Sequence, residues 1–306
     1  MQALKILNFG SLNIDYTYQV DHFVQAGETV SSRERRIFPG GKGLNQSIAL
    51  ARAGAPVYHA GAIGAQDGGF LRDLLHEAGA NVEHIEKNDA TASGHAIIQL
   101  DDSGQNCILL YGGTNQSITK ERADEVLAGF SEGDFLLLQN EINQMPYIIE
   151  KAHEKKMRIV LNPSPMDEKI ATMPLEYVEY FILNEVEASA LCGDVPTEKI
   201  VFALAEKYPE AKIVLTLGSA GSYYHFGEDT HYQPIYSVPV VDTTGAGDTF
   251  TGYFLACLMN GQPIPGALRW AAAASAIAVS REGAAPSIPS MDEVRNALPS
   301  MKEKRA

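Results

Sequence analysis

Short apolar runs alternate with helical segments along the second half of the sequence, and this rhythm restricts the fold more than any other feature. Strands are expected at 135–138, 158–161, 180–183 and 212–217, with helices between them at 147–156, 185–191 and 199–207. Strands separated by helices predict a mainly parallel sheet with helices on both faces. We therefore expect a doubly wound α/β fold.

Polar groups follow several of these strands at their carboxyl ends. Glu141 follows the first strand, Asn184 the third, and a glycine turn at 218–221 the fourth. In open α/β sheets, ligands bind beyond the carboxyl ends of the strands. The three positions are therefore expected to face one binding site.

The stretch DTTGAGD at 242–248 lies between a β-like run at 236–241 and an apolar helical segment at 250–259. Small residues before a helix leave backbone N–H groups free, and the helix dipole adds partial positive charge, so this turn suits a phosphate. Asp248, at its edge, is placed to accept a proton from an attacking hydroxyl. The stretch predicts phosphoryl transfer to an alcohol. The structural alternative is a tight strand-to-helix turn with Asp248 as a cap.

A second glycine-rich stretch, FPGGKG at 38–43, leads into a helix expected from Leu44 to Gly54. Its glycines let the backbone approach a ligand closely, and Lys42 and Asn45 lie at its mouth, where they can bind hydroxyls or charge. The GxxxxGK[ST] pattern of a Walker loop is absent. No GxGxxG follows the short buried strand expected at 5–9 either, which disfavours a dinucleotide oxidoreductase.

A strand expected at 12–16 alternates apolar and polar side chains. The period of two puts Asn13 and Asp15 on one face. An amide that donates and accepts, beside a carboxylate that accepts, can hold a vicinal diol. The alternative is the polar solvent face of an edge strand.

A small second sheet is expected beside the main one. Runs at 95–100 and 106–111 flank a turn at 101–105, which predicts a β-hairpin, and a charged run at 28–37 alternates like an exposed strand. Segments 14–37 and 94–112 together would form a β lid. A lid over the site would exclude water from phosphoryl transfer.

Two segments have the composition of cation sites. Glu187 lies one helical turn beyond Asn184, where it can hold Mg²⁺ through water, although the same pattern is typical of a helix cap. A small-residue helix expected at 267–280 is followed by a loop at 281–287. Backbone carbonyls of that loop, with those of Asp242 and Thr244, could form an oxygen cage for a monovalent cation.

Composition excludes several partners. The formal net charge of -14 disfavours a nucleic-acid surface and an anionic membrane. Cys107, Cys192 and Cys257 lie far apart without metal-ligand spacing, as expected in a reducing compartment. The sequence has no apolar run of the kind that forms a signal or membrane-spanning segment. We expect a cytoplasmic protein.

Five motifs, in order and at family spacing, resemble those of the ribokinase-like carbohydrate kinases, and most of all the ribokinases among them. They are GSLNID at 10–15, GGKGLNQ at 40–46, NEVE at 184–187, TLGSAG at 216–221 and DTTGAGDTF at 242–250. The similarity runs from about residue 5 to about residue 290. It implies one kinase domain over 1–306 and ATP-dependent phosphorylation of a sugar, with D-ribose the leading acceptor and ribose 5-phosphate the product. It also implies Mg²⁺ and K⁺ as cofactors and a homodimer formed through the lid.

The resemblance further implies roles for individual residues. Asp248 would be the general base, with Gly245, Ala246 and Gly247 forming the anion hole. The pentose hydroxyls would bind Asn13, Asp15, Gly41, Lys42, Asn45 and Glu141. ATP would bind Asn184, Thr216, Leu217, Gly218, Ser219, Ala220, Gly221 and Gly247, with Glu187 tied to Mg²⁺. The monovalent cation would lie among Asp242, Thr244, Ala278, Arg281, Gly283 and Ser287.

The sequence departs from ribokinases in two places. Ala272 occupies a position near the adenine where a larger polar residue is common, and YGGTN at 111–115 replaces a HAGAN-like run. Another sugar or a nucleoside is therefore the alternative acceptor. A non-catalytic sugar-binding protein is a rival of a different class, which the intact acid at 248 disfavours.

Overall fold

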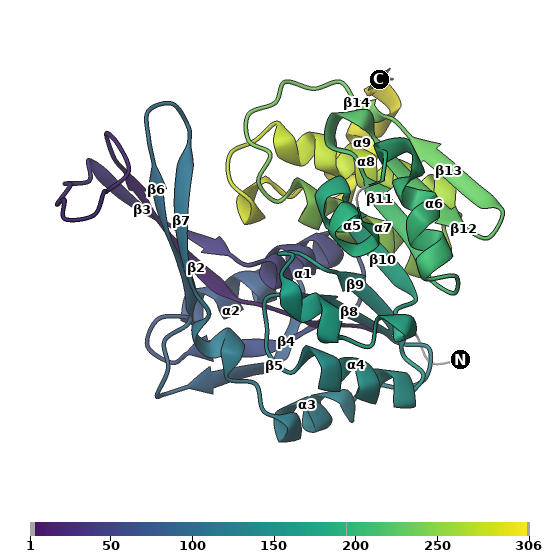
Figure 1. Ribbon diagram of the computed structural model, residues 1–306, viewed down its shortest axis with the longest axis horizontal. Coiled ribbons are helices and arrows are strands. Elements are labelled where there is room, and N and C mark those ends of the chain that lie inside the picture. Colours follow the sequence, from purple (N-terminus) through teal and green to yellow (C-terminus); the bar gives the residue numbers. More distant parts are fainter. Residues whose placement is uncertain (1–3, 194, 305–306) are drawn as a thin grey trace.

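The computed structural model describes residues 4–193 and 195–304, and its frame is a nine-stranded sheet (Figure 1). The strand order is β13-β12-β11-β10-β9-β8-β1-β4-β5, and every pairing from β11 to β5 is parallel. The strands are β1 (Ile6–Phe9), β4 (Val57–Gly64), β5 (Asn81–Asn88), β8 (Phe135–Gln139), β9 (Arg158–Asn162), β10 (Tyr180–Asn184), β11 (Lys212–Thr216), β12 (Ser222–Phe226) and β13 (Asp229–Gln233). The predicted mainly parallel α/β fold is confirmed.

Helices cover both faces of this sheet because its strands are apolar on both sides. Along β8, Phe135 and Leu137 pack into one core, while Leu136 and Leu138 pack into the other. The first core holds α1 (Lys42–Arg52), α2 (Gly69–Glu77), α7 (Ala246–Met259), α8 (Ile264–Val279) and α9 (Met291–Ala297). The second holds α3 (Lys120–Leu127), α4 (Met145–Glu154), α5 (Glu185–Cys192) and α6 (Thr197–Lys207). None of the described helices is long and apolar enough to cross a membrane.

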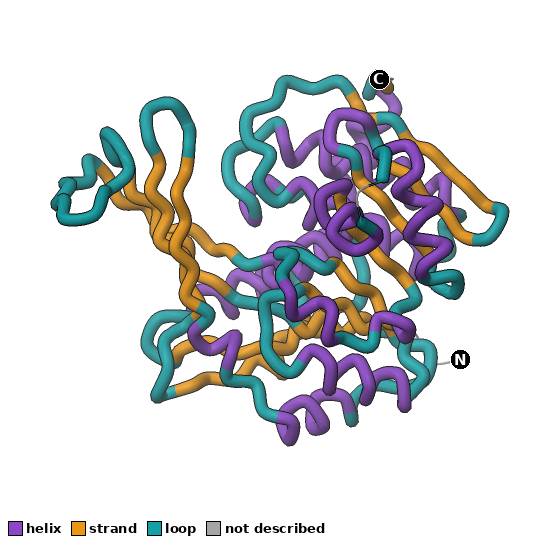
Figure 2. The backbone as a smooth tube through the Cα atoms, in the orientation of Figure 1, coloured by secondary structure: helices purple, strands orange, loops and turns teal. Residues whose placement is uncertain are grey.

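A separate four-stranded sheet projects from this body, as Figure 2 shows. Its order is β3-β2-β6-β7, formed by β2 (Asn13–Gln19), β3 (Glu34–Gly40), β6 (Gly94–Leu100) and β7 (Asn106–Tyr111). The predicted small second sheet therefore exists, and its action as a lid stays a prediction. The expected strand at 28–37 begins only at Glu34.

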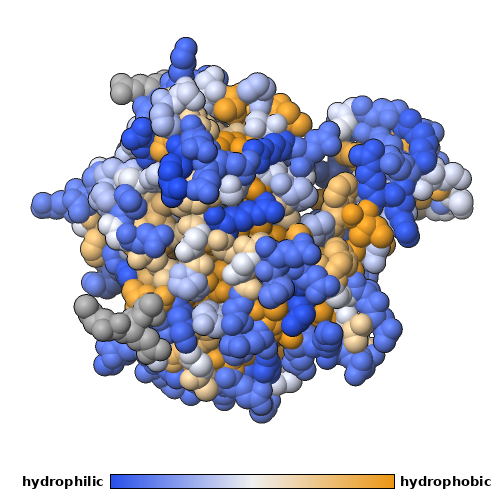
Figure 3. All heavy atoms as spheres, turned by 180° about the vertical axis from the view of Figure 1, so that it is seen from behind, coloured by the Kyte–Doolittle hydropathy of each residue, from blue (hydrophilic) through white to orange (hydrophobic). Residues whose placement is uncertain are grey.

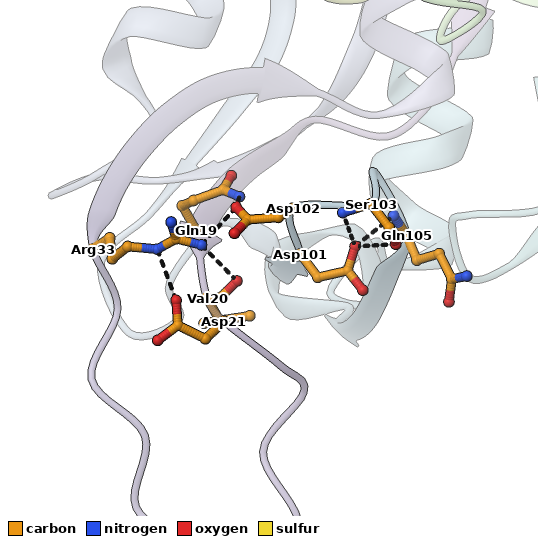
Figure 4. A network of polar contacts seen from close by, with 8 residues as sticks. All are labelled: Gln19, Val20, Asp21, Arg33, Asp101, Asp102, Ser103 and Gln105. Carbon is orange, nitrogen blue, oxygen red and sulfur yellow. Dashed lines mark hydrogen bonds and ion pairs between the residues drawn. The ribbon is translucent and has the colours of Figure 1, made fainter.

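Polar contacts at the tip of the projecting sheet tie its two loops together (Figure 4). The Arg33 guanidinium lies 2.6 Å from Asp102 in the hairpin turn and 3.0 Å from Asp21 in its own loop. Asp101 accepts hydrogen bonds from Ser103 and from the backbone of Gln105, which closes the turn. These exposed contacts give the tip a defined shape.

Around the 242–248 stretch one local prediction is wrong, and the predicted helix is present with an earlier start. The β-like run at 236–241 is almost entirely loop: β14 comprises only Ile235–Tyr236, which pairs with β15 (Glu303–Lys304). Pro239 lacks the N–H that a strand ladder needs, so the pairing ends early. The following helix begins at Ala246, four residues before the expected start, which places Asp248 in its first turn.

Helices α1 and α7 pack with their backbones unusually close. A Cβ atom at Gly252 of α7 would lie 2.4 Å from the Cβ of Ala49 and 2.8 Å from the backbone nitrogen of Leu50, both on α1. Such distances leave no room for any side chain. Glycine therefore sets the spacing of the two helices.

We expect Gly252→Ala to lower the free energy of unfolding by about 1–3 kcal/mol, because overpacking outweighs the gain of about 1 kcal/mol in helix propensity. Chemical denaturation measures the change. Gly69→Ala on α2 is the matched control, since no atom lies within 4 Å of its added Cβ. Equal stabilities of the two variants would contradict the close-packing account.

Candidate active site

The site lies where the chain changes direction within the sheet. From β1 the chain runs outward to β4 and β5, and it then returns to β8 on the other side of β1. Such a switch point leaves a crevice at the carboxyl ends of the strands. The segments that follow β1 and β8 meet there, because the Ser11 hydroxyl donates a hydrogen bond to Glu141 Oε2.

Two carboxylates face each other on the side of the crevice nearest the projecting sheet. Glu141 accepts a second hydrogen bond, 2.8 Å long, from the backbone N–H of Lys42, and burial raises its pKa. Burial, and then the nearby charge of Glu141, raise the pKa of Asp15 to about 6. A Cβ at Gly40 would lie 2.2 Å from the Asp15 carboxylate, so only glycine fits opposite it.

Asn13 lies two residues before Asp15 on β2 and is buried. Its side-chain oxygen accepts a hydrogen bond of 2.7 Å from Asn115, whose own oxygen accepts from the backbone of Leu12. Asn115 therefore fixes the amide of Asn13, and the free amide nitrogen of Asn13 remains a donor.

Asp248 lies opposite these groups, in the first turn of α7. The turn begins at Gly245 with φ 74°, and a Cβ there would lie 3.0 Å from the side chain of Ala284. The Asp248 side chain is buried, and one amide donates to each of its oxygens: Asn45 at 3.0 Å and Gln46 at 2.9 Å. The first turns of α1 and α7 thus meet at one carboxylate.

Lys42, the first residue of α1, faces a cavity of about 240 Å³ whose lining also includes Glu187 and Asp248. Burial alone would lower the pKa of Lys42, but the charges of Asp248, Glu141 and Glu187 outweigh it and raise the pKa. The Lys42 side chain is therefore a charged ammonium. It lies near residues expected to bind the sugar and near Glu187, which is expected to hold the metal of ATP, rather than with the sugar-binding residues alone.

A larger cavity, of about 610 Å³, adjoins the first. Its lining includes these residues expected to bind ATP: Asn184, Thr216, Gly218, Ser219, Gly221 and Gly247. Leu217 and Ala220 are not among the lining residues. Instead, the backbone N–H of Leu217 donates to Gly221 at 2.8 Å and closes the turn. Ala272 lines the cavity beside Ser275 and Ala276.

Asn184 and Glu187 form a complete capping box at the start of α5. The Asn184 side chain accepts from the backbone of Glu187 at 3.0 Å, and the Glu187 carboxylate accepts from the Asn184 backbone at 3.0 Å. The capping interpretation is confirmed. Each carboxylate oxygen has two lone pairs, so the group can still accept a water held by a metal.

The segments of the expected monovalent-cation site lie together. Asp242 accepts hydrogen bonds from the backbone of Thr244 and from that of Gly283, both at 2.9 Å, which joins the two loops. The Arg281 guanidinium points to Glu293 at 2.7 Å. The described residues contain no group of three or more His, Cys, Asp or Glu side chains suited to a metal.

Several residues of the site escaped the sequence analysis. Ser11, Gln46 and Asn115 hold Glu141, Asp248 and Asn13, and the first two lie inside motifs from which only their neighbours were chosen. The nucleotide-sized cavity is also lined by these residues: Gln233, Pro234, Ile235, Tyr236, Val238, Val240 and Phe250. They carry no glycine pattern or charge that would mark them in a sequence.

A helix N-terminus with a buried acid, set between a polyol-sized polar crevice and a nucleotide-sized cavity in a doubly wound sheet, is the arrangement of an α/β phosphotransferase. The model of the pfkB family carbohydrate kinases matches residues 3–291. The chain belongs to this family and is a carbohydrate kinase.

Individual relatives agree over almost the whole chain. A ribokinase of Bacillus subtilis is 35% identical over 292 residues, which cover 94% of this chain and 97% of that protein. The structure of Arabidopsis thaliana ribokinase complexed with ribose and ATP superposes with a TM-score of 0.87 at 30% identity, covering 97% of this chain and 99% of that one. A Cryptococcus neoformans ribokinase in complex with ADP gives 0.85 at 32% identity, with the same coverage.

We expect Glu141→Gln to lower the pKa of Asp15 below about 6, because the substitution removes a neighbouring negative charge. Part of the elevation remains, since burial is its larger cause. The titration of the Asp15 carboxyl carbon by NMR measures the shift. Glu154→Gln, in an exposed pair with Lys151, is the control. An unchanged Asp15 titration in Glu141→Gln would contradict the coupling.

Proposed function

We propose that the protein is an ATP-dependent kinase for D-ribose, which it phosphorylates at the 5-hydroxyl to ribose 5-phosphate. The observation that carries this proposal is the position of Asp248, which is buried in the first turn of α7 and lines the smaller cavity, while Ala246 and Gly247 of the same turn line both cavities. The relative from Arabidopsis thaliana whose structure holds ribose and ATP supports both substrates.

Asp248 acts as the general base. It accepts the proton of the acceptor hydroxyl as the oxygen attacks the terminal phosphate of ATP. The backbone N–H groups of Gly245, Ala246 and Gly247 at the start of α7 would stabilise the charge of that phosphate, which would replace the 3.3 Å bond from the Ala246 N–H to the carbonyl oxygen of Thr243. Lys42, charged and close to Asp248 and Glu187, supplies a cation at the boundary of the two substrates.

The sugar binds in the crevice beside the projecting sheet. Asn13 donates, Asp15 and Glu141 accept, and Asn45 and the Gly41 backbone complete the set. Because Asp15 and Glu141 are close enough to raise each other's cost of ionisation, hydroxyl groups that donate to both relieve this repulsion. A polyol with adjacent hydroxyls fits this pair of acceptors.

ATP would occupy the larger cavity, and Glu187, which lines the adjoining smaller one, would hold Mg²⁺ through water; the ion would supply positive charge to the phosphates. Polar side chains or backbone groups that could bind ATP come from these lining residues: Asn184, Thr216, Gly218, Ser219 and Gly221. K⁺ binds the loops joined by Asp242. Carbonyls of Thr244, Ala278, Arg281, Gly283 and Ser287 are the oxygens available there.

The protein acts as a homodimer through the projecting sheet, in the cytoplasm. Large apolar side chains are exposed on β3, β6 and β7: Ile37, Ile97, Ile108, Leu109, Leu110 and Tyr111. Figure 3 shows hydrophobic atoms gathered on this sheet, below a hydrophilic tip. The strand register puts Ile37, Ile97, Leu109 and Tyr111 on one face of the sheet, and an exposed apolar patch of this kind marks a protein interface. The three free cysteines support a reducing compartment.

We expect Asp248→Asn to fold and to bind ATP while its sugar phosphorylation falls by about 10²–10⁴-fold, because the amide cannot accept the hydroxyl proton. Steady-state kinetics and ATP titration measure the two properties. Asp89→Asn, at an exposed turn, should keep full activity. Turnover near the parental rate in Asp248→Asn would overturn the base assignment.

The acceptor is tested by a coupled assay of ADP release with D-ribose, 2-deoxyribose, ketohexoses and nucleosides, each with and without K⁺. We expect D-ribose to give the largest kcat/KM and K⁺ to increase it. A better turnover with another sugar or a nucleoside would replace ribose as substrate. ADP release that no acceptor stimulates would favour the non-catalytic alternative.

A further inference from the structure

Asp248 is held by a buried chain of amides that extends away from the substrates. Gln46 donates to Asp248 at 2.9 Å, and the side-chain oxygen of Gln46 accepts from Gln139 at 2.7 Å. The Gln139 nitrogen also donates to Asn8 at 3.0 Å. Gln46, Gln139 and Asn8 are all fully buried, so none of them contacts solvent in the crevice.

The orientation of every amide in this chain is fixed by a backbone carbonyl at its far end. The Asn8 nitrogen donates to the carbonyl oxygen of Gly43 at 2.8 Å, and a carbonyl can only accept. The oxygen of Asn8 must then face Gln139, whose nitrogen faces the oxygen of Gln46. The nitrogen of Gln46 is left to face Asp248.

A second anchor acts on the same nitrogen. Gln46 also donates to the side-chain oxygen of Asn162 at 3.2 Å, and the Asn162 nitrogen donates to the carbonyl oxygen of Ile182 at 2.8 Å. The Gln46 amide nitrogen therefore uses both of its N–H groups: one donates to the carboxylate of Asp248 and the other to the side-chain oxygen of Asn162. At its other end the series of hydrogen-bonded amides reaches the core: Asn8 donates to the hydroxyl of Ser47, which is hydrogen-bonded to His59. Burial lowers the pKa of His59 to about 3 and keeps the imidazole neutral.

We propose that Gln46 is a positioning residue for the reaction: it contacts neither substrate, and its hydrogen bond holds the Asp248 carboxylate turned toward the acceptor hydroxyl. The inference rests on the proposed function, because it takes Asp248 as the base. A hydrogen bond to the charged form of a carboxylate favours that form. A fixed donor on one oxygen also prevents the carboxylate from rotating, so the lone pairs of the other oxygen keep one direction. The charged groups that face Asp248 are Lys42 and Glu141, and neither depends on Gln46.

Gln46→Glu and Gln46→Met separate this role from a packing role. The glutamate has the shape of glutamine but places an oxygen where the donor was, so two carboxyl groups share one proton. We expect the acidic limb of the kcat–pH profile, at saturating D-ribose and Mg·ATP, to move up by at least about one pH unit. Saturating sugar removes the separate effect of Asp15 on sugar affinity. In Gln46→Met, kcat should fall about 10- to 100-fold at little change in sugar KM.

Gln105→Glu, on the exposed hairpin turn, is the matched control and should reproduce the parental profile. A Gln46→Glu profile that superimposes on the parental one, or a Gln46→Met variant with parental kcat, would overturn the proposal. If Gln46→Glu does not fold, Gln46→Met alone decides. An inactive Asp248→Asn beside an unshifted Gln46→Glu removes the positioning role alone, whereas an active Asp248→Asn removes the base assignment itself.

Discussion

The meeting of α1 and α7 at the Asp248 carboxylate is the contact on which the site depends. The two helices are about two hundred residues apart in the chain, and glycine at 252 lets them pack closely enough for Asn45 and Gln46 to reach Asp248. A buried carboxylate is costly unless hydrogen bonds replace its water. The two amides supply those bonds, so the contact that joins the helices also holds the carboxylate of Asp248 in place in the crevice.

Local charge, rather than the net charge of the protein, determines what this crevice can hold. The chain carries a formal charge of -14, and Asp15, Glu141, Glu187 and Asp248 all lie in or beside the site. Against them the site sets the ammonium of Lys42, and the N-terminus of α7 adds partial positive charge; Lys304 lines the larger cavity. Under the proposed function, an anion would be attracted to the region between Lys42 and the start of α7, close to Asp248.

Sequence patterns predicted the elements of the fold and failed where tertiary contacts decide. Periodicity located the strands from β8 to β11 and the hairpin of β6 and β7, because burial repeats along them. The loop at 237–241 looked like a strand because its apolar residues were counted without the effect of Pro239. Edge strand β5 was missed because its exposed side is charged.

The same limit applies to the site. Glycine motifs and isolated acids are visible in a sequence, so Asp248, Glu141 and Lys42 were all selected in advance. Ser11, Gln46 and Asn115 act by holding other side chains across 100 to 200 residues, and only the packed structure brings those partners together. Residues that support a functional group are thus the hardest to predict, because no local pattern distinguishes them from core.

The two halves of the site differ in how firmly they are built. The acid and its amides are buried and joined by hydrogen bonds to backbone carbonyls, whereas Val186 and Val240 in the lining of the larger cavity are 70% and 66% exposed. Exposed segments with few buried contacts open at low free-energy cost, and networks in the core do not. A ligand in the larger cavity can therefore order its walls without disturbing Asp248. The position of the Asp248 carboxylate is thus fixed without any ligand, which is the condition for the proposed base to act without reorganisation.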